Sequence, residues 1–269
     1  MLLLIPYPVI NPILVHIGPL PIRWYALAYI VGIISGWAYV RHLVGKDSLW
    51  GKVAHPSQAS IDDLVVYVAF GIILGGRIGY VLFYNLPVYL AHPLEIFAVW
   101  KGGMSFHGGM IGVMVAIYFF CRKRGLDWAK IGDLFAVVTP VGLFFGRLAN
   151  FVNGELWGKP TDVPWAMVFP RAPDALPRHP SQLYEAALEG VLLFIIMQIA
   201  LRVFHAQRRP GLMVAIFLTG YGLFRGFVEL YRDSDTVYFG FFSVGMSLSI
   251  PMFLIAAYFY WHAFKGKRA

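Results

Sequence analysis

The sequence predicts an all-α integral membrane protein with about seven transmembrane helices, and three observations carry that prediction. Of its 269 residues, 59% are hydrophobic and only 13% are charged, whereas a soluble domain has about 25% charged residues. The mean hydropathy is +0.66. The apolar residues are clustered in runs that can cross a hydrocarbon core of about 30 Å, which takes about 20 helical residues. We therefore expect residues 1–269 to form a single polytopic membrane domain with no separate soluble domain.

The N-terminal stretch MLLLIPYPVINPILVHIGPLPIRW is apolar but lacks the basic leader of a secretory signal peptide. Prolines recur along it, and proline interrupts a helix because it removes a hydrogen bond and clashes with the preceding turn. We expect this segment to be retained and to lie at the membrane interface before the first span.

Long apolar runs predict the transmembrane helices, with boundaries good to a few residues. The predicted spans are residues 22–43, 62–84, 104–121, 131–150, 183–203, 211–231 and 243–264. The segment 87–100, PVYLAHPLEIFAVW, is shorter and opens with proline, so an interfacial helix is expected there. Residues 151–182 contain Trp157 and Trp165, and since linkers are poor in such residues, we expect a small ordered periplasmic cap.

The distribution of lysine and arginine predicts the orientation. The regions after the first, third, fifth and seventh spans hold 13 of these residues, and the regions on the other side hold 6. The positive-inside rule then places the N-terminus outside and the C-terminus in the cytoplasm. In a membrane protein, a net charge of +8 reflects such loops and anionic headgroups, so no nucleic-acid partner is expected.

Three arginines fall within or at the ends of predicted spans, each among glycines: Arg77, Arg147 and Arg225. An arginine there is costly unless it faces protein, water or an anion. One interpretation is that each reaches the interface or pairs with a glutamate; the candidates are Glu155, Glu185, Glu189 and Glu229. The other, which three such arginines favour, is that they converge on a bound anion. Phosphate is the obvious one, because a guanidinium offers it a planar donor fork.

Further polar residues accompany these arginines. Asn150 lies three residues after Arg147, on about the same helical face, and could donate to the same headgroup. His107 stands between two glycine pairs and could act as a proton acceptor near neutral pH, or be a core histidine bonded to a carbonyl. Tyr25 belongs to an interfacial aromatic belt and could instead donate to a lipid headgroup.

Other chemistries find no support in the sequence. The chain has one cysteine, Cys121, and contains no HExxH motif, no Gly-x-Ser-x-Gly elbow and no Walker loop. We expect neither a metal nor a cofactor.

Five motifs together resemble the bacterial prolipoprotein diacylglyceryl transferase family, in order along essentially the whole chain. They are GGRIGYVLFYN (75–85), GGMSFHGGMIG (102–112), GRLANFVNGELWG (146–158), RHPSQLYEAALEG (178–190) and YGLFRGFVE (221–229). The third is the most specific, and it departs from the family pattern only at Ala149, where glycine is usual.

The resemblance implies a reaction and a location. Such an enzyme transfers the diacylglyceryl group of phosphatidylglycerol to the thiol of the lipobox cysteine in a prolipoprotein signal peptide and releases glycerol phosphate. It works without metal or cofactor, in the lipid of the bacterial inner membrane, as the first step of lipoprotein maturation. The family topology of seven spans with a periplasmic N-terminus agrees with the charge distribution above.

The resemblance also implies residue roles. Arg147 resembles the arginine that binds phosphatidylglycerol, Arg225 a second essential arginine that holds the phosphate, and His107 the base that deprotonates the thiol. The remaining matched positions are Tyr25, Asn150 and Gly158, on which family activity depends, and Glu155, Tyr221 and Glu229, which are supporting residues. The sequence alone leaves two alternatives open, a transporter for anionic lipids and a structural scaffold, although no inverted repeat is evident around the three arginines.

Overall fold

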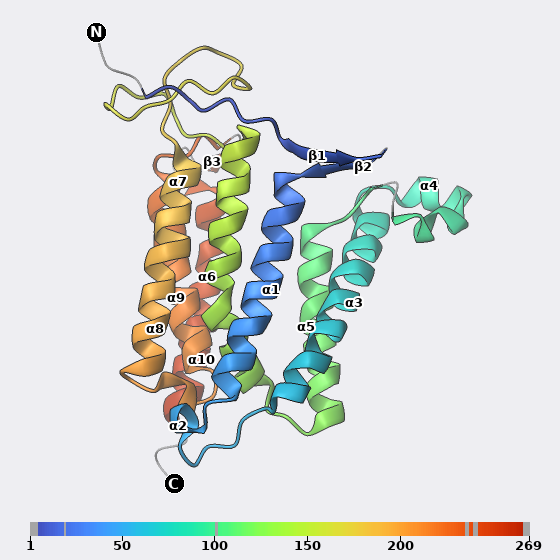
Figure 1. Ribbon diagram of the computed structural model, residues 1–269, viewed down its shortest axis with the longest axis vertical. Helices are drawn as coiled ribbons and strands as arrows, with labels where there is room; N and C mark the ends of the chain where they lie inside the picture. Colours follow the sequence, from blue (N-terminus) through green and yellow to red (C-terminus); the bar gives the residue numbers. More distant parts are fainter. Residues whose placement is uncertain (1–4, 19, 100–101, 235–236, 239–241, 266–269) are drawn as a thin grey trace. The chain divides into compact units, whose positions relative to one another are not determined.

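The computed structural model describes residues 5–18, 20–99, 102–234, 237–238 and 242–265, and the chain divides into two compact units (Figure 1). Unit 1 comprises residues 1–40, 48–51 and 132–269, and unit 2 comprises residues 41–47 and 52–131. That all 269 residues act as one domain stays a prediction.

The described chain is largely helical, with two short hairpins and a long loop between α6 and α7. Its longer helices are α1 (Trp24–Val44), α3 (Gln58–Phe83), α5 (Phe106–Arg124), α6 (Trp128–Asn153), α8 (Leu193–Arg202), α9 (Leu212–Glu229) and α10 (Val244–Lys265). The shorter elements are α2 (Asp47–Trp50), α4 (Leu86–Ala91), η1 (Pro93–Phe97), α7 (Ser181–Glu185), η3 (Ala186–Leu192) and η4 (Ala206–Arg208). Strands β1 (Ile13–Ile17) and β2 (Leu20–Arg23) pair antiparallel, as do β3 (Val237–Tyr238) and β4 (Phe242–Ser243).

The predicted membrane class is confirmed. Among the described residues, six helices are long and apolar enough to cross a membrane: α1, α3, α6, the continuous stretch Ser181–Arg202, α9 and α10. The remaining predicted span, 104–121, corresponds to α5, whose last three residues are basic and shorten its apolar length. All seven predicted spans thus coincide with helices, because apolar runs of this length are a local property of the sequence.

Two segments that we expected at the interface have their own local structure. The N-terminal segment forms the β1–β2 hairpin, since its prolines disfavour a helix, and Trp24 N donates to Pro12 O at its base (3.1 Å). The described part of the segment 87–100 is helical over most of its length, as predicted, but it is divided into α4 and η1 at Pro93; residue 100 lies outside the described residues. Its position at the membrane interface stays a prediction.

Glycines set the packing of α3 on α5 in unit 2. A methyl group on Gly79 would lie 2.7 Å from Gly108 Cα, and one on Gly75 would lie 2.7 Å from Gly112 Cα. No side chain fits between backbones that approach this closely. These glycines therefore serve helix packing.

In unit 1, α6 fixes the start of α9. The buried carboxylate of Asp133 accepts hydrogen bonds from Gly211 N (2.8 Å) and Val214 N (3.0 Å). These are amides at a helix N-terminus that lack partners within the helix, and a carboxylate there also suits the helix dipole. The contact helps to orient α9, which carries Arg225, relative to α6, which carries Arg147.

Candidate active site

The end of α6 is tied to the loop that follows it by the polar residues of the GRLANFVNGELWG motif. Asn150 Nδ2 and Asn153 Nδ2 both donate to Glu155 Oε1, at 2.9 and 3.3 Å. Gly154 (φ 62°) and Leu156 (φ 60°) adopt left-handed backbone conformations that turn the chain back. Asn150 and Glu155 thus have structural partners here, and their roles in substrate binding stay predictions.

The predicted cap, residues 151–182, is ordered around its own apolar core. Phe151, Met167 and Phe169 are buried together, and Tyr7 of the N-terminal segment packs against them. The Tyr7 hydroxyl donates to Phe151 O at 2.6 Å. Burial raises the pKa of Tyr7, which keeps this donor protonated.

Gly158 occupies a position that admits no side chain. An added methyl group would lie 2.6 Å from both His179 Cβ and Tyr231 O. Gly158 N donates to His179 O (2.8 Å), and Arg178 Nη1 donates to Gly158 O (3.2 Å). Close backbone packing therefore requires a glycine at this position, and the dependence of activity on Gly158 stays a prediction.

Charged groups next to this glycine hold the cap. Arg178 also donates to Asp174 Oδ2 (2.8 Å) and Asp233 Oδ2 (2.5 Å). The hydrogen bond from Arg178 holds the pKa of Asp174 below its usual range. Burial lowers the pKa of His179, because desolvation disfavours the charged imidazolium.

Of the three arginines expected to converge on an anion, Arg147 and Arg225 meet around shared carboxylates, so the alternative of pairing with a glutamate describes these two. Arg147 Nε lies 3.3 Å from Glu185 Oε2, and Arg147 Nη2 donates to Glu189 Oε2 at 3.1 Å. Arg225 Nη1 donates to Glu185 Oε1 and lies 3.9 Å from Glu189 Oε1. Glu185 and Glu189 flank the start of the π-helical turn η3, a backbone irregularity that is frequent at functional sites.

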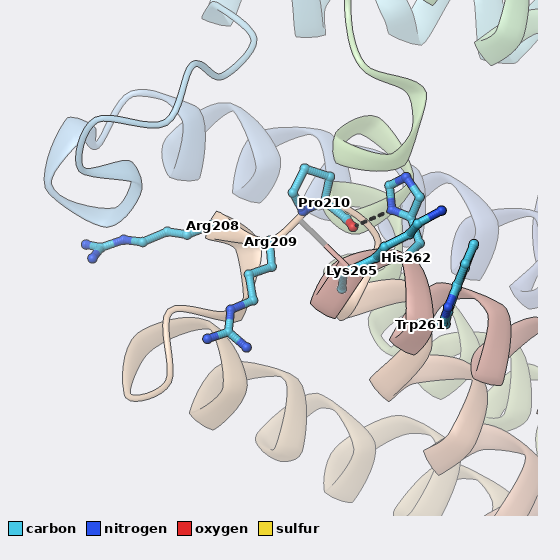
Figure 2. A pocket seen from close by; sticks show the side chains of 7 residues that line it. Arg208, Arg209, Pro210, Trp261, His262 and Lys265 are labelled. Carbon is cyan, nitrogen blue, oxygen red and sulfur yellow. Dashed lines mark hydrogen bonds between the residues drawn. The ribbon is translucent and has the colours of Figure 1, made fainter. Parts of the chain in front are cut away.

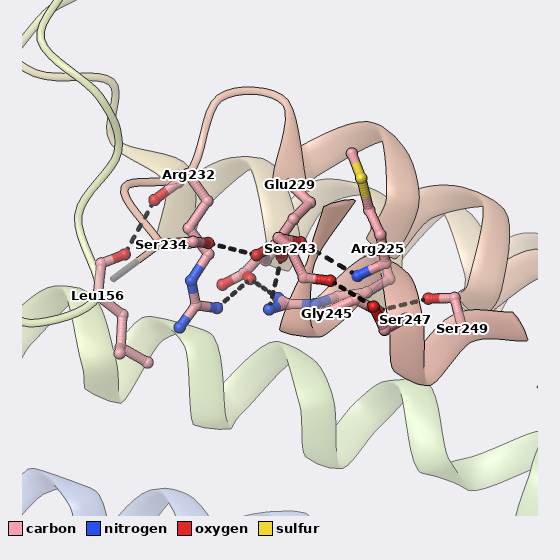
Figure 3. Close-up of polar contacts among 12 residues, drawn as sticks. Leu156, Arg225, Glu229, Arg232, Ser234, Ser243, Gly245, Ser247 and Ser249 are labelled. Atoms are coloured by element: carbon pink, nitrogen blue, oxygen red, sulfur yellow. Dashed lines mark hydrogen bonds and ion pairs between the residues drawn. The ribbon is translucent and has the colours of Figure 1, made fainter. Parts of the chain in front are cut away.

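A third arginine joins this group, which we call the arginine–glutamate cluster: Arg147, Arg225, Arg232, Glu185, Glu189 and Glu229. Arg232 Nη1 donates to Glu185 Oε1 at 2.9 Å, and Arg225 Nη2 lies 2.9 Å from Glu229 Oε2. Figure 3 shows Arg225, Glu229 and Arg232 extending toward one another beside the start of α10. Gly245 permits that approach, since a methyl group on it would lie 2.8 Å from Glu229 Cδ. Three positive and three negative side chains leave the cluster neutral.

The arginine side chains are the more exposed part of the cluster. The carboxylate side chains are 0–3% exposed, whereas those of Arg225, Arg147 and Arg232 are 13%, 15% and 16% exposed. Among the described residues, Arg147 Nη1 and Arg232 Nη2 donate to no acceptor. The carboxylates therefore occupy only part of the donor set of the guanidiniums, and the remaining N–H groups of Arg147 and Arg232 have no acceptor among the described residues.

Two predicted tyrosines lie in the same unit as this cluster. Tyr25 and Tyr29, one turn apart on α1, have hydroxyl oxygens 3.3 Å apart, and Tyr29 interacts electrostatically with Arg147. Tyr221 of α9 stacks on Phe217 and interacts electrostatically with Glu189 and Arg147. Their roles in catalysis or binding stay predictions.

Arg77 belongs to unit 2, and its guanidinium is occupied by backbone carbonyls. Its Nε donates to Ile96 O (2.8 Å), and its two terminal nitrogens donate to the carbonyl oxygens of Gly102 (2.6 Å), Gly103 (3.1 Å), Glu95 (2.5 Å) and Ala98 (3.4 Å). All five N–H donors of an arginine are thereby used. The contacts define a structural role that organises the η1 segment, and a substrate-binding role for Arg77 stays a prediction.

His107 lies in the first turn of α5, also in unit 2. Its side chain is exposed and packs edge-on against Phe106, with ring centroids 5.6 Å apart. It has no hydrogen-bond partner among the described residues, so it is not a core histidine bonded to a carbonyl. Its proposed role as a base is compatible with that exposure and stays a prediction.

Sequence reasoning missed the central position of Glu185 and the membership of Arg232. The sequence offers Glu185 only as one of four possible glutamate partners, and it gives Arg232 no role beyond the lysine and arginine distribution. A usable signal was present: Glu185 and Glu189 are four residues apart in an apolar helix, and intramembrane carboxylates are rare unless they are paired. The i, i+4 and i+7 spacing of Arg225, Glu229 and Arg232 is a second signal, although α9 ends at Glu229 and Arg232 follows the helix.

Fold and site together define the class of protein. It is a multi-pass all-α membrane protein with a neutral cluster of arginines and glutamates, in which the carboxylates are buried and the arginine side chains are partly exposed. Comparison with known proteins gives the particular family. The family model for prolipoprotein diacylglyceryl transferase matches residues 12–262, and the chain belongs to that family of transferases.

Relatives are similar over almost their whole length. The phosphatidylglycerol–prolipoprotein diacylglyceryl transferase of Methylocella silvestris is 57% identical over 256 residues, which cover 94% of this chain and 93% of that protein. The protein of the same name from Rhodospirillum rubrum is 53% identical, and the match covers 94% of this chain and 92% of that protein. The one from Bradyrhizobium diazoefficiens is 52% identical, and the match covers 94% of this chain and 91% of that protein. The resemblance drawn from the motifs is confirmed.

Proposed function

We propose that the chain transfers the diacylglyceryl group of phosphatidylglycerol to the thiol of a lipobox cysteine in a prolipoprotein signal peptide, as the first step of lipoprotein maturation. The observation that carries this proposal is the arginine–glutamate cluster, in which guanidiniums from separate elements share buried carboxylates and keep free donors. It is supported by relatives whose names state these two substrates.

The reaction is a displacement at carbon. The thiol loses its proton, the sulfur attacks the glyceryl carbon that bears the phosphate, and a C–S bond replaces the C–O bond. The electron pair of that bond leaves with glycerol phosphate. The nucleophile belongs to the substrate, and a cysteine thiol with a pKa near 8.5 needs only a modest base. His107 is the proposed base.

The phosphate is held by the arginine side chains of the cluster. Arg147 and Arg225 bind the phosphodiester oxygens, with Arg232 as a third donor, and they stabilise the charge that develops as the phosphate leaves. Glu185, Glu189 and Glu229 fix the guanidiniums before the lipid arrives, so little reorganisation accompanies the reaction. Tyr25, Tyr221, Asn150 and Gly158 support this site.

The orientation of the chain follows from the lysine and arginine distribution. We place it in the bacterial inner membrane, with the N-terminus and the cap periplasmic and the C-terminus cytoplasmic. The cluster, at the cap end of α6 and α9, then belongs to the outer leaflet, where a lipoprotein precursor presents its lipobox.

The test is direct. Purified protein is incubated with phosphatidylglycerol and a lipobox peptide, and both glycerol phosphate and thioether-linked peptide are measured. Arg147→Lys and Arg225→Lys keep the charge but lose the fork, so each is expected to reduce transfer about a hundredfold. Arg171→Lys, an exposed arginine of the cap, serves as the matched control and should be fully active. Lipid binding without glycerol phosphate release would instead indicate a transporter.

A further inference from the structure

A second basic feature lies at the other end of unit 1. An open pocket of about 600 Å³ is formed between the loop that precedes α9 and the end of α10 (Figure 2). Its charged lining is entirely basic: Arg208 and Arg209 from the loop, and His262 and Lys265 from α10. Figure 2 shows His262 turned toward Pro210, whose carbonyl oxygen lies 3.3 Å from its Nδ1.

This pocket is distinct from the arginine–glutamate cluster. Both involve α9, which has 18 residues and is therefore about 27 Å long at 1.5 Å per residue. The pocket precedes the first turn of α9, and Arg225 and Glu229 lie in its last two turns. A ligand at one place does not touch the other.

Two cations of the pocket, Lys265 and Arg209, lie over aromatic rings. Lys265 Nζ lies 4.4 Å from the centroid of the Trp261 ring, and Arg209 Cζ lies 4.7 Å from that of Phe264. Among the described residues, neither cation forms an ion pair. A cation–π contact holds the charged group in place while its N–H donors stay available.

Arg208 contributes in a different way. Its Nε donates to Leu49 O (3.0 Å) and its Nη2 to Ser48 O (3.2 Å), so this side chain fastens the loop to α2. Among the described residues, Arg209 and Lys265 are therefore the two cations of this pocket whose side-chain donors have no acceptor.

The location of the pocket selects the class of ligand. The candidate spans end at Lys265 in α10 and begin at Leu212 in α9, so we expect residues 208–210 and 261–265 to lie near the boundary between hydrocarbon and water. Trp261 and Phe264 are 56% and 48% exposed, as is usual for aromatic side chains at a membrane interface. Phospholipid phosphates lie at this level, and basic residues near it attract anionic lipids.

We propose that this pocket binds the headgroup of an anionic phospholipid, with Arg209 and Lys265 on the phosphate and the exposed aromatic rings along the upper acyl chain. The lipid is a bound component and not the substrate, since no group of the arginine–glutamate cluster reaches it. It holds the end of α10 against the start of α9.

The test uses the full-length protein in a neutral detergent, with dioleoylphosphatidylserine as the probe because it is anionic without being the proposed substrate. Native mass spectrometry counts the retained lipids. We expect the R209Q/K265Q variant to retain one phosphatidylserine fewer per chain, with binding at this site about tenfold weaker. The R209K/K265R variant keeps both charges and should bind as the wild type does. Arg171→Gln removes one exposed charge from the cap and should leave the count unchanged.

Three results would overturn the proposal. The first is that R209Q/K265Q retains as much phosphatidylserine as the wild type, and the second is that the wild type retains as much dioleoylphosphatidylcholine as phosphatidylserine. The third is that inorganic phosphate displaces the bound phosphatidylserine completely, which would indicate a site for free phosphate. If the double variant does not melt cooperatively, the single variants R209Q and K265Q carry the same comparison. Lipid counting needs no turnover, so its result is independent of the proposed transferase reaction.

Discussion

Replacing Glu185 by glutamine is the most informative perturbation of the arginine–glutamate cluster. Glu185 is fully buried and is the residue that touches all three guanidiniums of the cluster. Glutamine keeps the shape and one acceptor oxygen but removes the charge, so the cluster changes from neutral to a net charge of about +1.

The magnitude follows from the burial of these groups. Removing one partner of a buried ion pair costs about 3–5 kcal/mol, because the charge left behind has no compensation. The three arginine side chains are 13–16% exposed, so water recovers part of that loss, and we expect about 3 kcal/mol. For a chain of this size, this corresponds to a decrease in Tm of roughly 6–12 °C.

The assay is thermal unfolding of the purified protein in detergent, followed by glycerol phosphate release at a temperature where both proteins are folded. Asp63→Asn is the matched control, since it makes the same chemical change in an ion pair with Arg124 that is 46–49% exposed. Exposed pairs contribute about 0–1 kcal/mol, so the control should melt near the wild type. If Glu185→Gln melts with the control and turns over normally, the cluster is not held by this carboxylate and our account of the site is wrong.

Three further outcomes are expected. Gly158→Ala should destabilise the cap by about 1–3 kcal/mol, since the methyl group would overlap His179 and Tyr231 O, and faster limited proteolysis of residues 159–178 would report it. Burial lowers the pKa of His179 in the folded protein below the unfolded value of about 6.5. The neutral His179 therefore stabilises the cap at a pH above about 6.5, and this stabilisation is lost as the pH falls through the folded pKa. Cap stability measured between pH 7 and pH 5 should fall in the wild type and fall less in His179→Gln. Lysine has too few donors for the five carbonyls that Arg77 binds, so Arg77→Lys should lower the free energy of unfolding by about 2 kcal/mol, measured as a lower Tm. Arg122→Lys, on the exposed end of α5, should leave the Tm unchanged.

Local features of the sequence were enough to predict the helices and the family. Each apolar run is recognisable by itself because membrane hydrocarbon requires a minimum helix length, and all seven runs coincide with helices in the structure. The order of the motifs was enough to indicate the family, which the relatives confirm. The prolines of the N-terminal segment excluded a helix, but they did not predict the β1–β2 hairpin, which depends on pairing between two short segments.

The candidate site could be predicted only in part. The cost of an arginine within a span singled out Arg147 and Arg225, and the structure brings both onto Glu185. The same argument singled out Arg77, whose partners are backbone carbonyls from residues 95–103, and no side-chain pattern in the sequence announces such a set of acceptors.

The sequence by itself determined that this protein crosses a membrane, where its long helices lie to within a few residues, and which arginines need a partner. Each of these depends on the free energy of transferring a short segment out of water. Only the tertiary structure decided which partner each arginine has. Glu185 reaches Arg147, Arg225 and Arg232 because three separate elements are rotated to face one another at one depth, and the rotation and depth of a helix are set by packing against its neighbours.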